Sequence, residues 1–192
     1  MKIAVYAPAK NEERNAEAWA KSCADADYRV VIDTGSTDNT KNVLQDEGVT
    51  VYDTLISPWR FDDAYNIAMS LCPADADICI CLHMDERLEE GWRELIENAW
   101  TPETTRLRYT YVWSWNPDGS PGRVWSGDRI HARKGHRWLG ATHEGLCARY
   151  GVKELHTFCN ELRILHFPDA KDKSHDLSLL LEAKQEMPHD AR

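Results

Sequence analysis

The chain has 192 residues with 23 basic and 32 acidic side chains, which gives a formal net charge of −9 at pH 7. This length suits one domain with one core, and the acidic balance argues against non-specific binding to nucleic acid or anionic membranes. No segment contains the roughly 20 apolar residues of a membrane span. The first residues enter a strand without a signal-peptide pattern, and six cysteines lie mostly in apolar segments. These features predict a cytoplasmic protein with reduced thiols.

The first hundred residues alternate between strand and helix patterns. Strands are predicted at Ile3–Tyr6, Arg29–Asp33, Thr50–Tyr52 and Ile78–His83. Helices are predicted at Glu12–Ala24, from Asp38 to Gly48, from a cap at Asp62 or Asp63 to Pro73, and over Trp92–Ala99. This alternation predicts a mainly parallel sheet with right-handed crossover connections and helices on its faces.

After Pro102 the pattern becomes β-rich. Strands are predicted at Arg106–Trp115, Arg123–Trp125, Arg129–Ala132 and Glu161–His166, with a type I turn at Asn116–Gly119. Residues 174–187 return to helical spacing. We expect a single domain with a βα half over residues 1–100, a β-rich half over residues 101–168 and a C-terminal helix within residues 169–192.

The segment VVIDTGSTDNT, residues 30–40, is the most informative in the chain. An apolar run ends in Asp33, Gly35 provides a turn, and hydroxyl and acidic side chains then open a helix. Ligands of open α/β sheets bind just outside the carboxyl ends of the strands. An acidic side chain there accepts hydrogen bonds from a base or a ribose, and the backbone N–H groups beyond it suit an anion. The segment therefore predicts half of a nucleotide site.

The loop after the fourth predicted strand, His83-Met84-Asp85-Glu86, predicts a metal site at the same edge. Side chains alternate along a strand, so His83 and Asp85 point the same way if the strand continues. An imidazole and a carboxylate suit a borderline divalent cation such as Mn²⁺ better than Mg²⁺. The alternative is that Asp85 and Glu86 merely cap the next helix.

Several segments, in this order and spacing, resemble the inverting family-2 glycosyltransferases of the GT-A fold. They are KNEE at residues 10–13, VIDTGSTDNT at 31–40, FDDAYN at 61–66, WLGATHE at 138–144 and ILHF at 164–167. The resemblance covers nearly the whole chain. It implies a Rossmann-like α/β domain with a mixed, mainly parallel sheet flanked by helices, in which the β-rich half binds the acceptor.

The resemblance also implies a reaction and its site. A sugar would move from a nucleotide-diphosphate donor, UDP-linked by expectation, to a hydroxyl of a glycan, a peptide or another compound. The implied donor-binding residues are Ala7, Pro8, Glu12, Asp33, Asn66, Met84 and Asp85. The implied ligands of a divalent cation, Mn²⁺ rather than Mg²⁺, are His83, Asp85 and His166. Glu144 is implied as the general base that deprotonates the acceptor.

This chain departs from the family pattern at two positions. His83 stands where the family usually has Asp, and Tyr65 stands where an Arg often precedes the Asn of the third motif. The first change lowers the negative charge at the metal site, and the second removes a cation that would face the donor.

Aromatic residues concentrate in the β-rich half, where residues 109, 111, 113 and 115 share one strand face. Flat aromatic rings stack on sugars or bases, although core packing accounts for about half of these rings. The candidate acceptor-binding residues are Trp113, Trp115, Trp138 and His143.

Two other functions remain open from the sequence. A nucleotidyltransferase shares the architecture, but its triphosphate loop is usually Gly-rich and basic, whereas residues 8–12 contain no Gly. A non-catalytic module that binds nucleotide sugars or glycans would fit if His83 prevents metal binding. A local basic groove would also be compatible with a nucleic-acid acceptor. An NAD enzyme is disfavoured, because no Gly-x-Gly-x-x-Gly follows the first strand.

Overall fold

The computed structural model describes residues 1–168 and 176–186. In chain order the elements are β1 (Ile3–Ala9), α1 (Glu13–Ser22), β2 (Tyr28–Asp33), α2 (Thr40–Asp46), β3 (Thr50–Asp53), α3 (Phe61–Leu71), β4 (Ile78–Cys81), β5 (Glu86–Leu88), α4 (Trp92–Ala99), β6 (Arg106–Val112), β7 (Val124–Ala132), β8 (His136–Leu139), β9 (Gly145–Ala148), β10 (His156–His166) and α5 (Asp176–Glu186).

Eight strands form one sheet in the order β3-β2-β1-β4-β7-β6-β10-β5. The first four strands in this order are parallel, and β7 is antiparallel to both β4 and β6. β10 is parallel to β6 and antiparallel to β5. β8 and β9 form a separate antiparallel pair. The predicted mixed, mainly parallel α/β sheet flanked by helices is confirmed.

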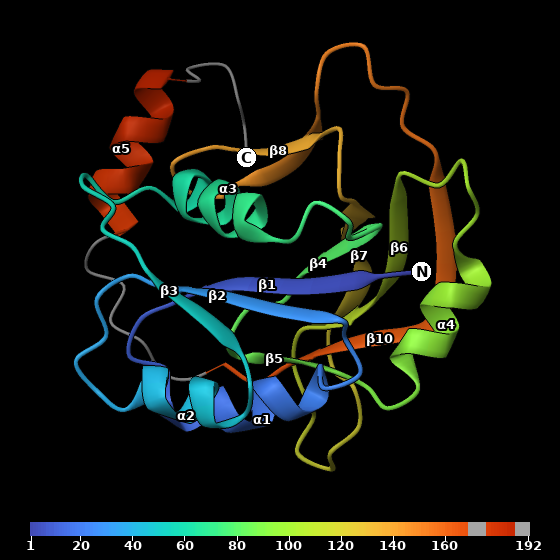
Figure 1. Cartoon of the computed structure of the whole chain (residues 1–192), viewed down its shortest axis with the longest axis horizontal. Helices are drawn as coiled ribbons and strands as arrows, with labels where there is room; N and C mark the ends of the chain where they lie inside the picture. Colours follow the sequence, from blue (N-terminus) through green and yellow to red (C-terminus); the bar gives the residue numbers. More distant parts are fainter. Residues whose placement is uncertain (169–175, 187–192) are drawn as a thin grey trace.

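Alternation along the strands divides the interior into two cores. In β1, Ile3 and Val5 belong to the core on the side of α1, whereas Ala4 and Tyr6 belong to the core on the side of α3. Figure 1 shows α1 and α2 on one face of the sheet and α3 on the other. Both faces of β1 are therefore covered, which explains why the strand is apolar at consecutive positions rather than at every second one.

The β-rich half differs in detail from the sequence prediction. The two strands predicted between residues 123 and 132 are one strand, β7, while β5, β8 and β9 were not predicted at all. These three strands have only three or four residues each, too few for a clear alternation of apolar and polar side chains. Their positions depend on pairing with distant segments rather than on local pattern.

The start of α3 also differs from the prediction. α3 begins at Phe61 after Arg60, so Asp62 and Asp63 lie in its first turn instead of capping it. Acidic side chains are favourable in a first turn because they face the positive end of the helix dipole. The predicted C-terminal helix is present as α5, and the rest of the predicted segment at 169–175 and 187–192 lies outside the described residues.

All six cysteines are free thiols, and five of them are buried. Within the described residues, no helix is both long enough and apolar enough to cross a bilayer.

Candidate functional site

Two cavities share His83: one opens where the loops after β1, β2 and β4 meet, and the other is lined mainly by residues of the β-rich half. The first, which we call the edge cavity, is lined by Pro8, Ala9, Lys10, Glu12, Thr34, Trp59, Phe61, Tyr65, His83, Met84 and Asp85. The second, which we call the tryptophan cavity, is lined by His83, Tyr111, Trp113, Trp125, Ser126, Gly127, Asp128, Arg129, Trp138, Glu144, Gly145, Leu146, Cys147 and His166.

Asp33 ends β2 with a carboxylate that is only half satisfied. Its Oδ1 accepts hydrogen bonds from the N–H groups of Gly35 at 3.0 Å and Ser36 at 2.9 Å. Its Oδ2 is buried and accepts no hydrogen bond from any described residue. A buried carboxylate oxygen without a donor is costly, so this atom is suited to accept a hydrogen bond from a ligand. The adjacent Thr34 lines the edge cavity.

The backbone N–H groups that follow Asp33 do not form the anion site that the sequence predicted. Two of them donate to Asp33 itself, the N–H of Thr37 donates to Asn11 Oδ1 at 2.8 Å, and the N–H of Thr40 donates to Asp38 Oδ1 at 3.1 Å. Side-chain oxygens of Asn and Asp commonly satisfy N–H groups in turns and at helix starts. That part of the prediction is wrong, because the chain supplies its own oxygen atoms to these N–H groups.

The loop after β1 contributes Pro8 and Glu12 to the edge cavity, as the sequence led us to expect. Glu12 is 8% exposed and accepts a hydrogen bond from Asn15 Nδ2 at 3.0 Å, while its N–H donates to Thr40 Oγ1 at 2.7 Å. These bonds fix the loop against the start of α2. Ala7 is fully buried in the core and does not line the cavity.

Of the other three predicted donor-binding residues, Met84 and Asp85 line the edge cavity and Asn66 lies apart from it. The amide of Asn66 is bonded to the backbone of Trp138, with Nδ2 donating to the carbonyl at 2.9 Å and Oδ1 accepting from the N–H at 2.9 Å. Asn66 therefore fixes β8 to α3 and faces a different cavity.

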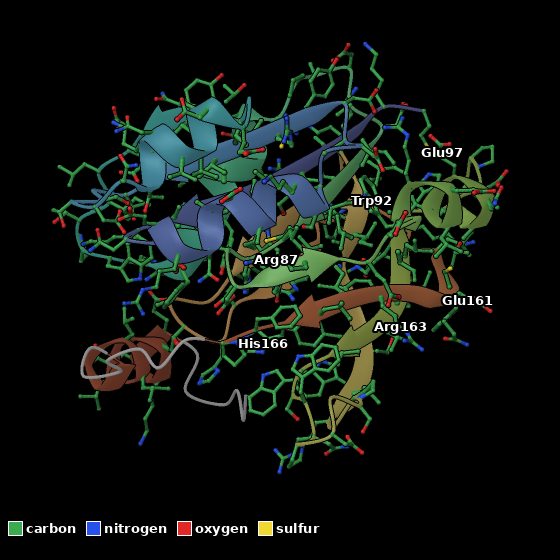
Figure 2. All side chains as sticks on the ribbon, turned by 90° about the horizontal axis from the view of Figure 1, so that it is seen from below. Arg87, Trp92, Glu97, Glu161, Arg163 and His166 are labelled. Carbon is green, nitrogen blue, oxygen red and sulfur yellow. The ribbon has the colours of Figure 1, made fainter. Side chains whose placement is uncertain are left out.

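Asp85 and His166 meet where the two halves of the sheet join. His166 Nε2 lies 3.5 Å from Asp85 Oδ2. Figure 2 shows β10 running from Glu161 to His166, and His166 pairs across from Glu86 of β5. The Nδ1–H of His166 donates to the carbonyl of Trp113 at 2.9 Å, which directs Nε2 toward Asp85.

The carboxylate of Asp85 favours the protonated form of His166. Burial alone lowers the pKa of His166, but hydrogen bonds to Asp85 and to the Trp113 carbonyl outweigh it and raise the pKa above its usual value. An imidazole nitrogen and a carboxylate oxygen at this separation are suitable ligands for one cation. The described residues contain no group of three or more His, Cys, Asp or Glu side chains arranged around one point.

His83 is held by other side chains instead. Arg129 Nη1 lies 2.7 Å from His83 Nε2, and the hydroxyl of Tyr65 lies 2.9 Å from the same nitrogen. A guanidinium only donates, so Nε2 is the acceptor and the neutral ring carries its proton on Nδ1. Burial, reinforced by the charge of Arg129, lowers the pKa of His83 to about 4. Nε2 of His83, a residue that the resemblance implied as a metal ligand, thus accepts hydrogen bonds from other side chains.

Glu86 is the functional-site residue that the sequence analysis missed. It is fully buried, and it accepts hydrogen bonds from the N–H of His83 at 2.8 Å, the hydroxyl of Tyr111 at 2.6 Å and Arg129 Nη2 at 2.5 Å. Burial acts to raise its pKa, but Arg129 and these hydrogen bonds together hold the pKa below its usual value. The alternative in which this residue caps the next helix is wrong, because Glu86 opens β5 and Gly91 precedes α4.

Glu144, which the sequence resemblance implied as the general base, lines the tryptophan cavity together with His83 and His166. Burial raises its pKa above the usual value. A raised pKa suits a carboxylate that must take a proton. His143 has a positive φ of 51° and is exposed, and it does not line this cavity.

The predicted aromatic residues separate into two groups. Trp113 lines the tryptophan cavity at 39% exposure, and Trp125, which was not among the predicted residues, lines it at 48%. Their ring centroids are 5.8 Å apart. Trp138 reaches the cavity but is 2% exposed, with Nε1 donating to Tyr6, and Trp115 instead stacks on Phe167.

Comparison with known proteins supports the fold. No protein-family model matches the chain, and no curated protein matches it either. The glucosyl-3-phosphoglycerate synthase of Mycobacterium tuberculosis in complex with phosphoglyceric acid aligns with 69% of this chain and 57% of its own length, at 20% identity and a TM-score of 0.50. Its complex with Mn²⁺ and UDP-glucose aligns with 57% of this chain and 43% of its own length, at 22% identity and 0.48.

TarS of S. aureus in complex with UDP-GlcNAc aligns with 64% of this chain and 37% of its own length, at 16% identity and a TM-score of 0.47. The chain spans less than two thirds of the length of these structures. The order of the strands and the synthase complex with a TM-score of 0.50 agree with the fold class that the sequence motifs implied. The chain has a GT-A, Rossmann-like fold.

Proposed function

We propose that this protein is a metal-dependent inverting glycosyltransferase that moves a sugar from a nucleotide-diphosphate donor, UDP-linked, to an acceptor hydroxyl. The observation that carries the proposal is the junction of the two cavities. There Asp85 lines the edge cavity, and its partner His166 lines the tryptophan cavity together with Glu144. A transferase of this kind needs a donor pocket, a cation site beside the diphosphate, and a base on the opposite side of the sugar.

The edge cavity would hold the nucleotide. The unpaired Oδ2 of Asp33 would accept a hydrogen bond from the base, and Pro8 and Glu12 would shape the adjoining wall. Lys10, which is exposed at the mouth of the cavity, would add a positive charge near the diphosphate. This arrangement corresponds to the general position of ligands outside the carboxyl ends of parallel strands.

Asp85 and His166 would hold the divalent cation. The donor set of one carboxylate oxygen and one imidazole nitrogen fits Mn²⁺ better than Mg²⁺, because Mg²⁺ prefers oxygen ligands. When bound, the cation would stabilise the negative charge of the leaving diphosphate as a Lewis acid. The hydrogen bond from His166 to the Trp113 carbonyl would hold the imidazole in the tautomer that presents Nε2.

His83 would serve the site by position rather than as a ligand. Its ring stacks on Tyr65 with centroids 5.4 Å apart, and its Nε2 accepts from Arg129. Arg129 in turn is neutralised by Glu86. The three side chains would form the wall between the donor and acceptor pockets and keep the cation ligands in place.

Glu144 would take the proton from the attacking hydroxyl. Glu144 lines the tryptophan cavity, as His166 does, and this cavity would be the acceptor side. The deprotonated acceptor oxygen would then attack the anomeric carbon from the side opposite to the leaving diphosphate, which inverts the anomeric centre. The exposed rings of Trp113 and Trp125 would stack on the acceptor, in the manner usual for sugars and bases.

The test is donor hydrolysis and donor binding across a panel of nucleotide sugars, with Mn²⁺, Mg²⁺ or EDTA, on the wild type and on Asp85→Ala. We expect hydrolysis of a UDP-sugar with Mn²⁺, weaker hydrolysis with Mg²⁺, and none with EDTA or with the variant. Hydrolysis that persists in EDTA would contradict the proposed cation role. Donor binding without any hydrolysis would instead support a non-catalytic module, to which the occupied Nε2 of His83 also points.

A further inference from the structure

A third cavity, which we call the basic cavity, lies along the C-terminal part of α3 and the turn between β7 and β8. Its lining residues are Asn66, Met69, Ser70, Arg133, Lys134, Gly135, His136, Arg137 and Arg149. None of them lines the edge cavity or the tryptophan cavity. The reaction proposed above assigns no role to this cavity.

Its charge contrasts with the rest of the chain. Four lining residues are cationic and none is acidic, whereas the whole chain has a net charge of −9. None of the four, Arg133, Lys134, Arg137 and Arg149, pairs with a carboxylate within the part of the chain that the structure describes. Glu154, which contacts the lining residue His136, is also paired with Arg106. Like charges repel, so four of them around one hollow are stable only with an anion or with solvent and salt.

Two of these guanidinium groups are fixed in place. Arg133 Nη2 donates to the carbonyls of Cys72 at 2.8 Å and Ser70 at 3.2 Å, at the C-terminal end of α3. Arg149 Nε donates to the carbonyl of His136 at 3.2 Å. A side chain that is already ordered loses little conformational entropy when a ligand arrives, so these contacts preorganise part of the cavity.

The other two cations are exposed at the mouth. Lys134 and Arg137 lie on either side of Gly135, which has a φ of 92°, and His136. His136 adds no charge at pH 7, because burial lowers its pKa. Guanidinium groups held by backbone carbonyls, together with further exposed cations, suit an oxyanion that is first attracted by charge and then bound by directed hydrogen bonds.

We propose that the basic cavity binds a phosphate-class oxyanion that carries more than one phosphate group. Arginine side chains bind phosphate through paired N–H donors, and the cavity presents three of them with one lysine. Its volume of about 450 Å³ lies within the range of small-ligand sites, roughly 300–1,000 Å³, and exceeds what one phosphate ion fills. This binding does not depend on the proposed transferase activity.

The experiment titrates the protein at low salt with inorganic phosphate, with tripolyphosphate and with a single-stranded oligonucleotide, followed by ¹H–¹⁵N NMR in the presence of EDTA. The first two arms separate a free phosphate ion from linked phosphate groups. The variant is Lys134→Gln with Arg137→Gln, both exposed residues without described hydrogen bonds. The matched control is Arg14→Gln with Lys21→Gln, which removes the same charge from exposed positions of α1 on the other face of the sheet (Figure 1).

We expect saturable shifts of the Gly135 and Arg137 amides with tripolyphosphate, and weaker binding of inorganic phosphate. The double variant should weaken tripolyphosphate binding by roughly tenfold or more, because a hydrogen bond to a charged group is worth about 1.5–3 kcal/mol. The control should bind within about twofold of the wild type, since distant exposed charges are screened.

Several results would overturn the proposal. They are the absence of saturable shifts around Gly135, shifts confined to the edge cavity, or equal weakening in the variant and the control. Binding of the oligonucleotide without binding of tripolyphosphate would assign the cavity to nucleic acid instead.

Discussion

The edge cavity and the tryptophan cavity are built in different ways, although they share a wall. The edge cavity comes from loops that follow β1, β2 and β4, and the turn next to its lining residue Thr34 is fixed locally by the bonds from Gly35 and Ser36 to Asp33. The tryptophan cavity comes from β6, β7, β9 and β10, and its polar groups are fixed by partners far away in the chain. Motifs therefore mark the first cavity, while tertiary pairing creates the second.

The wall between them contains two contacts between the βα half and the β-rich half. Arg129 of β7 bonds to Glu86 across 43 residues, and His166 of β10 faces Asp85. One contact is a buried ion pair, and the other is a candidate cation site. Substitutions that affect only one of these two pairs are the most direct way to test how the two cavities differ.

The largest effect is expected at the candidate cation site. Asp85→Ala should reduce donor hydrolysis with Mn²⁺ by roughly 10³-fold, because Lewis-acid stabilisation of a leaving group is worth several kcal/mol. His166→Ala should have a similar effect. Steady-state kinetics with a Mn²⁺ titration measures both, and the variants should also lose the dependence on metal concentration.

The control for these variants is Asp63→Ala, which removes an exposed carboxylate from the first turn of α3. It should leave hydrolysis within about twofold, as is usual for a surface residue. If Asp85→Ala retained metal-dependent hydrolysis at the control's level, the cation would have to bind elsewhere.

The next effect concerns the tryptophan cavity alone. Glu144→Gln should leave donor affinity unchanged and reduce transfer by about 10²–10⁴-fold, the usual contribution of a general base. In the wild type, transfer should decline as the pH falls through a pKa above 4.5, because burial raises the pKa of Glu144. Transfer that persists in Glu144→Gln with the same pH profile would assign the base to another residue.

The sequence predicted the edge cavity better than the tryptophan cavity for a physical reason. Asp33 ends an apolar strand and precedes a glycine turn, so its place at the sheet edge follows from local rules. The same rules suggested a free row of N–H groups there. They failed on that point because side-chain oxygens, including that of Asn11 on the other loop, take up the N–H groups.

The Glu86–Arg129 pair was beyond local rules. Glu86 is fully buried on a strand of three residues, and its partner lies on a strand that the sequence divided in two. A buried charged residue cannot be recognised from the pattern of apolar residues. Arg129 comes close to Glu86 only because β7 pairs with β4 and β6. The contact of His83 with Arg129 depends on the same pairing, so no local pattern in the sequence indicated it.

The buried pair should control stability rather than metal binding. Glu86→Gln leaves the guanidinium of Arg129 buried without its counter-charge, and loss of one partner of a buried ion pair costs about 3–5 kcal/mol. Urea unfolding followed by tryptophan fluorescence measures the change in the free energy of unfolding.

The matched control is Glu89→Gln, one residue beyond β5. Glu89 pairs with Arg163 at 3.9 Å, but both side chains are nearly half exposed, so little change in stability is expected. An equal loss of unfolding free energy in the two variants would mean that the Glu86–Arg129 ion pair stabilises the protein no more than an exposed pair does.

The smallest effect is expected at His83 and appears as a pH dependence. The folded-state pKa of about 4 lies below the ordinary 6.5, so the unfolded chain binds the proton first as the pH falls. His83 therefore contributes stability above pH 6.5 that is lost between pH 6.5 and about 4, at most about 3 kcal/mol. His83→Asn should lose stability less steeply over this range, as measured by urea unfolding at several pH values.

The same variant decides between the two roles of His83. If the side chain serves as a wall residue held by Arg129, His83→Asn should retain the Mn²⁺ dependence of donor hydrolysis and lose far less activity than Asp85→Ala. If it is a cation ligand, the variant should require much more Mn²⁺ for half-maximal activity, because one of three protein ligands is gone. Two measurements on this one variant thus separate the two roles. The pH dependence of stability reports the environment of His83 beside Arg129, and the Mn²⁺ titration reports the cation site.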